Sequence, residues 1–332
     1  MTRRHADAPA GVGGWGTRGR PVPATPGRLG RRSWWQVLKR TVAEFRTDNL
    51  TDWAAALTYY GILSIFPALL ALVSILGLLG SSAIQPLLDN LAGVAPGTVR
   101  QGLTTVLESL QSQPTGASIG FIVGLALALW SASGYVVAFM RASNAVYDMP
   151  EGRPVWKTLP VRIGVTVVLV VLLAISAVAV VFTGGLARRA GSVLGVGPTA
   201  ITAWDIAKWP ALIVLVAVML SILYWAAPNV KHPGFRWITP GGVLAVLIWM
   251  AASAAFAVYI TNFASYSKTY GSLAAVIIFL VWLWITNIAV LLGAEFDAEL
   301  QRERAIVGGH PVEREPYAEP RDTRKMAPPE TP

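Results

Sequence analysis

The sequence of 332 residues contains no cysteine and only three histidines, and 14% of its residues are charged. The missing cysteine excludes disulfide frameworks and thiolate metal sites. Ordinary soluble proteins have about 25% charged residues, so the low charge argues against a water-soluble fold. With 54% hydrophobic residues and 13 tryptophans, and a mean hydropathy of +0.53, the composition indicates a protein that crosses a membrane several times.

The groups that carry enzymatic chemistry are scarce. His5, His232 and His310 fall in a tail, a loop and a second tail, and neither an H-E-x-x-H pattern nor a Walker A phosphate loop occurs. An active site needs nucleophiles, bases or metal ligands that converge in space. We therefore expect no enzyme, no metal site and no cofactor.

Six apolar runs are each long enough to cross the hydrocarbon core of a bilayer, which takes about 20 helical residues. They fall near residues 54–79, 119–146, 161–186, 206–227, 237–260 and 270–294. Pro67 lies inside the first run and predicts a kink or a local break, because proline removes a backbone donor from a helix. The predicted fold class is all-α: a polytopic membrane helix bundle with six transmembrane helices, occupying residues 34–302.

The segments around the spans are of two kinds. Trp34, Leu38 and Val42 recur at helical spacing among basic residues, which predicts an interfacial amphipathic helix over residues 34–50. Two apolar stripes within residues 80–118 predict further amphipathic helices on the outer face of the bundle. Residues 1–33 and 303–332 combine charge with proline and are expected to form disordered cytoplasmic tails.

The net charge of +9 is a signal of topology, because the basic residues are unevenly placed. If the N-terminus lies inside, most of the 27 lysines and arginines fall in inner segments. Only five fall outside, namely Arg100, Arg188, Arg189, Lys208 and Lys268. By the positive-inside rule, both termini are predicted to be cytoplasmic. The basic excess then attracts anionic lipid headgroups, and nucleic acid is not an expected partner.

Ionisable residues near the span ends are candidates for function, since charge is costly inside a membrane. Arg141 lies in the last turns of the second span with Asn144 on the same face, and Asp52 and Glu295 stand at the ends of the first and sixth spans. One hypothesis is that Arg141 pairs with Asp52 or Glu295 and ties three helices into a gate. The alternative is that Arg141 reaches the lipid phosphates while the acids face water.

Aromatic and uncharged polar residues extend this set. Helical spacing places Trp130 and Arg141 on one face of the second span, and Asn287 lies about midway across the sixth. Polar groups at such depth need partners on other helices, so packing between helices is the alternative to a substrate path. The candidates for a substrate path or gate are Asp52, Tyr59, Tyr60, Pro67, Trp130, Arg141, Asn144, Asn262, Tyr266, Tyr270, Asn287 and Glu295.

Three stretches resemble the YihY/BrkB family of bacterial inner-membrane proteins, a family once labelled ribonuclease BN. They are NLTDWAAALTYYGILSIFPALLAL (49–72), LWSASGYVVAFMRASNAVYDMPEGRPVWK (129–157) and YITNFASYSKTYGSLAAVIIFLVWLWITNIAVLLGAEFDAEL (259–300). The resemblance implies a multi-pass helical protein of the bacterial cytoplasmic membrane. It also implies a link to virulence in one member and to lipid export in another. Of the candidates above, all but Asn287 match the family pattern by position, as does Gly271.

These observations favour a transporter or flippase-like exporter of a lipid or other amphiphile, with membrane lipids as partners. The alternative is a non-transporting membrane scaffold that organises envelope components. A ribonuclease is the weakest of the three hypotheses, because the sequence offers no site for its chemistry. The oligomeric state is left open between a monomer and a homo-oligomer.

Overall fold

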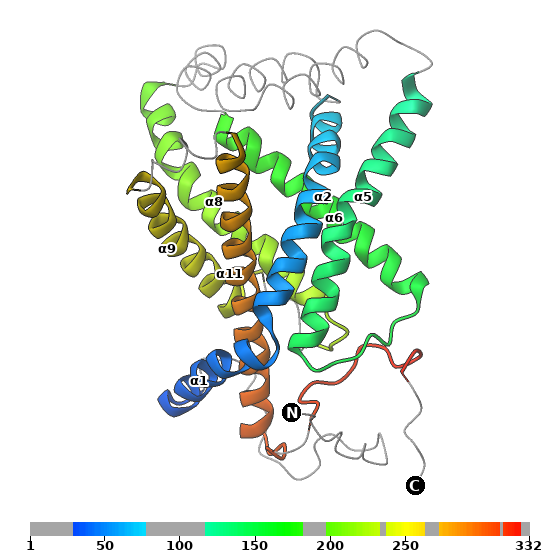
Figure 1. Ribbon diagram of the computed structural model, residues 1–332, viewed down its shortest axis with the longest axis vertical. Coiled ribbons are helices and arrows are strands. Elements are labelled where there is room, and N and C mark those ends of the chain that lie inside the picture. The colour runs from blue at the N-terminus through cyan, green and yellow to red at the C-terminus, as the bar shows by residue number, and fades with distance from the viewer. Residues whose placement is uncertain are drawn as a thin grey trace.

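The computed structural model describes residues 29–77, 117–181, 197–232, 237–262, 272–312 and 315–326. Within these ranges the chain is helical, and the one strand-like feature is an isolated bridge between Val230 and Pro320. The predicted all-α class is therefore confirmed. The helices, drawn in Figure 1, are α1 (Arg31–Thr47), α2 (Leu50–Gly77), α5 (Ala117–Val146), α6 (Val155–Val181), α8 (Pro198–Ala226), α9 (Pro240–Asn262) and α11 (Ser272–Val307).

Five of these helices are long and apolar enough to cross a membrane over Leu125–Val146, Val155–Val180, Thr199–Ala226, Pro240–Ile260 and Val276–Val307. They correspond to the second through sixth predicted spans, and α2 takes the place of the first. The boundaries differ most at α11, which continues to Val307 rather than ending near 294, and next at α8, which begins at Pro198 rather than near 206. Pro210 therefore lies three turns inside that helix instead of in its first turn.

The outward faces of the helices are apolar. Leu127 of α5, Leu173 of α6 and Leu247 of α9 all have about half or more of their surface exposed. In water, contiguous apolar surface of this kind marks a site for interaction with a partner or a membrane. On long apolar helices such surface indicates that the lipid bilayer surrounds the bundle, which confirms a helical membrane protein.

Packing inside the bundle centres on α2, α5 and α11, with α2 lying along α5 for much of its length. Their buried side chains include Leu57, Phe139 and Leu291. Of the kink or local break predicted at Pro67, the break is wrong, because α2 continues through this residue to Gly77, and the kink stays a prediction. Packing against two neighbouring helices compensates for the single backbone donor that proline removes.

Helices α9 and α11 approach each other through glycines. A Cβ atom on Gly241 would lie 2.0 Å from the backbone oxygen of Gly293, and one on Gly293 would lie 2.5 Å from the oxygen of Gly241. Small residues allow such close backbone contact, which matters in membranes because lipid supplies no hydrophobic drive between helices. The two glycines therefore set how closely α9 and α11 can pack.

One end of the bundle carries helix α1, the turns at 147–154 and 227–232 and the segment 315–326; we call it the terminal end (Figure 1). Helix α1 packs on α11, where Trp34 stacks on Phe296 and Arg40 bonds to Glu299 and Glu303. Its other face leaves Trp35, Leu38 and Val42 exposed. The predicted amphipathic helix is thus present, shifted to residues 31–47 and held on the bundle by one of its two apolar faces.

The C-terminal region differs from the expected disordered tail. Helix α11 extends to Val307, and segment 315–326 pairs with both turns of the terminal end. The amide of Lys231 donates to Glu319, that of Arg321 donates to Asn229, and that of Lys325 donates to Gly152. Composition alone predicted disorder here because it does not show that two loops offer unpaired backbone groups to the segment.

Candidate functional site

An arginine from α6 lies against the middle of α5. The Arg162 guanidinium donates 3.0 Å to the backbone oxygen of Trp130 and also donates to the hydroxyl of Ser133. Its central carbon lies 4.4 Å from the centre of the Trp130 ring, in cation–π geometry. Trp130 is 52% exposed on the outside of the bundle. The structure therefore places a cation beside the centre of a membrane-spanning helix, on its outward face.

A second arginine lies on the same face of α5. Arg141 follows Trp130 by eleven residues, or about three turns and roughly 16 Å along the helix. It is exposed, and its guanidinium lies 5.5 Å from the centre of the Tyr60 ring of α2. Tyr60 contacts Tyr59 edge to face, and Tyr59 also points outward. We call Tyr59, Tyr60, Trp130, Arg141 and Arg162 the aromatic–arginine flank.

The predicted pairing of Arg141 with Asp52 or Glu295 is wrong. Arg141 contacts Tyr60 instead, and its exposure agrees with the alternative in which it reaches the lipid phosphates. Asp52 is exposed in the first turn of α2, whereas Glu295 is buried inside the bundle. Spacing along each helix was correct, but it does not determine how the helices rotate against one another.

The flank borders a seam between α2 and α5. A Cβ atom on Gly134 would lie 3.7 Å from the hydroxyl of Ser64 and 4.0 Å from the Tyr60 ring. The Ser64 hydroxyl is buried and has no hydrogen-bond partner among the residues described. The seam therefore keeps a polar group directly behind the aromatic surface of the flank.

Asn287 lies inside the bundle rather than on the flank. It is 1% exposed, accepts a hydrogen bond from Tyr135 at 2.8 Å and donates to Thr58 at 3.1 Å. These bonds connect α11, α5 and α2. A lateral cavity shared by Tyr59, Trp130, Arg141 and Asn287 would have supported a substrate path, but the first three face outward and the fourth faces inward. Asn287 thus takes the packing role.

Glu295 is an unusual carboxyl. It is 1% exposed, and its Oε2 atom has no hydrogen-bond partner in the described part of the chain. The negative charges of Glu44, Asp48, Asp148 and Glu299 act on it electrostatically. Helix α11 continues for three more turns, so this residue does not close the span at a wet rim as the sequence suggested. Within the described ranges, no three acidic or histidine side chains are grouped to hold a metal ion.

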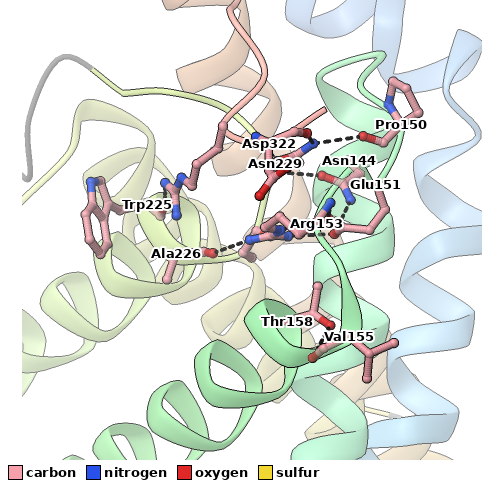
Figure 2. A network of polar contacts seen from close by, with 12 residues as sticks. Asn144, Pro150, Glu151, Arg153, Val155, Thr158, Trp225, Ala226, Asn229 and Asp322 are labelled. Atoms are coloured by element: carbon pink, nitrogen blue, oxygen red, sulfur yellow. Dashed lines mark hydrogen bonds and ion pairs between the residues drawn. The ribbon is translucent and has the colours of Figure 1, made fainter. Parts of the chain in front are cut away.

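A polar network closes the terminal end (Figure 2). Arg153 is 2% exposed, forms an ion pair with Glu151 at 2.7 Å and donates to the backbone oxygens of Ala226 and Ala227. Burial tends to raise the pKa of Glu151, but the bonds from Arg153 outweigh this effect and hold that pKa below its ordinary value. The turn at 147–154 is thereby fixed to the end of α8.

Two asparagines complete the network. The Asn144 side chain donates to Glu151 and accepts the amide of Asn229 at 2.7 Å. Asn229, fully buried, donates to the backbone oxygens of Pro150 and Asp322 and accepts the amide of Asp322 (Figure 2). One side chain therefore joins both turns to the C-terminal segment.

The predicted site residues separate into groups. Tyr59, Tyr60, Trp130 and Arg141 meet on the flank, Asn144 joins the network, and Asn287 and Glu295 are buried apart from both. Pro67 lies within α2 and Asn262 ends α9, while Tyr266 and Tyr270 lie outside the described residues.

Four residues were missed: Arg153, Arg162, Asn229 and Asp322. Only Arg162 carried a sequence signal, because it is an arginine at the start of an apolar run.

The outward apolar surface and the long helices define a polytopic helical membrane protein. The sequence profile of the family described as Virulence factor BrkB matches residues 41–317, and the chain therefore belongs to this family. No solved structure matches the chain.

Similar proteins come from several bacteria. YfkH of Bacillus subtilis, whose name describes it as ribonuclease-like, is 28% identical over 82% of this chain and 98% of its own length. A UPF0761 membrane protein of Alkalilimnicola ehrlichii is 30% identical over 78% of this chain and 57% of its own length. Another, from Aromatoleum aromaticum, is 27% identical, with 80% and 63% covered. The chain thus spans nearly all of YfkH but less than two thirds of these two UPF0761 proteins.

Proposed function

We propose that the protein moves a lipid or other amphiphile across the bacterial cytoplasmic membrane. The observation that carries this proposal is the position of Arg162, an arginine held on the outward side of α5 at the helix centre. Charged residues at that depth are costly and usually belong to substrate or ion pathways. An arginine kept there on a lipid-facing surface is suited to a ligand that arrives from the lipid phase.

The flank offers such a ligand two cationic positions at different depths. A headgroup with a phosphate or carboxylate would meet Arg141 nearer the terminal end and Arg162 about three turns further along α5. Its apolar chains would stay in the bilayer beside Leu63 and Leu127, which face outward from the same helices. The arrangement supports movement of the headgroup along the protein surface, as a flippase-like exporter requires.

The packing of Asn287 favours a second candidate, the non-transporting scaffold. Hydrogen bonds to Tyr135 and Thr58 lock three central helices together, which suits a static structure. A ribonuclease activity is not part of our proposal, since the ribonuclease-like name belongs to YfkH alone among these relatives.

Reconstituted liposomes distinguish the two candidates. Purified protein is incorporated into vesicles with labelled anionic or zwitterionic lipids, and transbilayer movement is followed. We expect faster movement than in empty vesicles, and a loss of about tenfold in Arg162→Gln, equivalent to roughly 1.4 kcal/mol. Arg32→Gln, on the exposed side of α1, is the matched control. If no lipid class moves faster than in empty vesicles, transport is wrong and the scaffold is favoured.

The proposal also places both termini in the cytoplasm. Because the chain has no cysteine, a single cysteine introduced in either tail can be labelled without background. Membrane-impermeant thiol reagents should reach both positions only in inverted vesicles. Labelling of either tail from the outside of intact cells would contradict the orientation.

A further inference from the structure

A cavity of about 350 Å³ opens at the terminal end, between the start of α6, the turn at 147–154 and segment 315–326. Arg153, Lys157 and Arg321 supply its positive charges, and Asp322 is its one acid. Trp156, Pro160 and Val161 form the apolar wall. The cavity therefore combines an excess of positive charge with a greasy side.

The three positive side chains differ in whether a carboxylate already pairs with them. Arg153 is almost fully buried and bonded to Glu151, so it serves as a fixed charge behind the cavity. Lys157 binds Asp322 at 2.7 Å, yet its side chain is 44% exposed and an ammonium group has two further donors. Each of these two charges is therefore matched by one carboxylate, and Lys157 keeps unused donors.

Arg321 is the most available cation. Its guanidinium donates to the backbone oxygen of Trp225 at 2.8 Å and lies 5.2 Å from the centre of that ring. No carboxylate forms an ion pair with it within the described segments. Burial and the nearby charge of Arg153 lower the pKa of Arg321, and these two effects outweigh the opposing effect of the Glu151 carboxylate.

The apolar wall indicates where the ligand comes from. Trp156 is 69% exposed in the first turn of α6, and aromatic side chains at helix ends favour the headgroup level of a membrane. A ligand bound here would touch lipid on one side and cations on the other.

We propose that this cavity binds the phosphate of an anionic phospholipid headgroup, with Arg321 and Lys157 as its ligands. This is a fixed binding site, separate from the flank, and it does not depend on transport. Arg321 belongs to segment 315–326 and Lys157 to α6, so a phosphate held between them joins the segment to the membrane-spanning bundle. Free phosphate shares this chemistry, and the test below separates the two sources.

Native mass spectrometry of the full chain in detergent provides the test. The protein is titrated separately with phosphatidylglycerol, phosphatidylcholine and inorganic phosphate. We expect one tightly held phosphatidylglycerol, and weakening of its affinity by about tenfold in Arg321→Gln, since hydrogen bonds to charged groups contribute roughly 1.5 kcal/mol or more. Arg32→Gln is the matched control, because Arg32 is exposed on α1 and does not line the cavity.

The outcomes are distinct. Equal affinity for the two lipids, or unchanged affinity for phosphatidylglycerol in Arg321→Gln, overturns the proposal. Binding of inorganic phosphate without phosphatidylglycerol overturns the lipid source. Lys157→Gln provides a second variant if Arg321→Gln does not fold, and thermal unfolding without lipid identifies that case. Because binding is measured, a failure of lipid transport on the flank would leave this result unaffected.

Discussion

Tyr135 donates a hydrogen bond of 2.8 Å to the side-chain oxygen of Asn287, deep between α5 and α11. The Asn287 amide donates in turn to Thr58 of α2. In a membrane interior no water can replace a lost partner, so each group of this chain depends on the next. The three helices are thereby held in one relative rotation.

Replacing Asn287 should destabilise the bundle. Asn287→Leu preserves volume but leaves the buried Tyr135 hydroxyl without a partner, which costs about 1–3 kcal/mol. Thermal unfolding in detergent measures the change. The double variant with Tyr135→Phe should recover part of the loss, because neither group is then left unpaired. If the two effects simply add, the bond contributes nothing specific.

Two glutamates one turn apart on α11 should respond in opposite ways. Glu299 bonds to Arg40 and Arg302, so Glu299→Gln should lower the free energy of unfolding by roughly 2 kcal/mol or more. Glu295 has an unpartnered oxygen among acidic neighbours, so Glu295→Gln should leave the unfolding temperature unchanged or raise it. A loss in Glu295→Gln as large as that in Glu299→Gln would show that the Glu295 carboxylate makes a stabilising contact.

The contact of α9 with α11 should tolerate no side chain at Gly293. Gly293→Val pushes the backbones of the two helices apart, and we expect several kcal/mol of destabilisation and little folded protein on size-exclusion chromatography. Gly164 in α6 is the control, because a Cβ atom there meets nothing within 4 Å. Gly164→Ala should stabilise the helix by about 0.5–1 kcal/mol. Equal behaviour of the two variants would contradict the close approach.

Lowering the pH should destabilise the folded protein through His232, which lies in the turn at 227–232. Burial, together with the charge of Arg321, lowers the pKa of His232 from 6.5 to about 4. Between these values the unfolded chain binds a proton that the folded chain does not, so stability falls as the pH falls through this window and is unaffected above it. The loss is about 3 kcal/mol at most, from roughly 1.4 kcal/mol per pKa unit.

Unfolding temperatures measured from pH 7.5 to pH 4 check this sign. His232→Gln should flatten the part of the profile between pH 6.5 and 4 while leaving the slope above pH 6.5 unchanged. An identical profile in wild type and variant would assign the acid sensitivity to other groups.

The helices and their order were predictable because length and apolarity suffice to identify a membrane span. The same pattern placed Trp130 and Arg141 on one face of α5, as the structure shows. It could not assign the partner of Arg141, since the rotation of α2 against α5 is set by side-chain packing between distant segments. Arg162 was overlooked for a related reason: its partner Trp130 is 32 residues away in sequence.

The contacts at the terminal end were the least predictable from the sequence. Asn229 and Asp322 exchange hydrogen bonds across 93 residues of sequence. Neither residue belongs to a motif, and the segment around Asp322 has the composition of a disordered tail. Its order comes from unpaired backbone groups in two turns, which no local pattern records.

The position of segment 315–326 near the end of the sequence also determines when the contacts of the terminal end can form during synthesis. A ribosome delivers all the spans to the insertion machinery before it synthesises Arg321 and Asp322. The contacts of the terminal end therefore form only after the helices have been inserted. Nascent chains halted after Val307 would be embedded yet leave Asn229 and Gly152 without their partners. Such chains would expose unpaired backbone groups at the terminal end to quality-control proteases at the membrane surface, although every hydrophobic helix is already inserted.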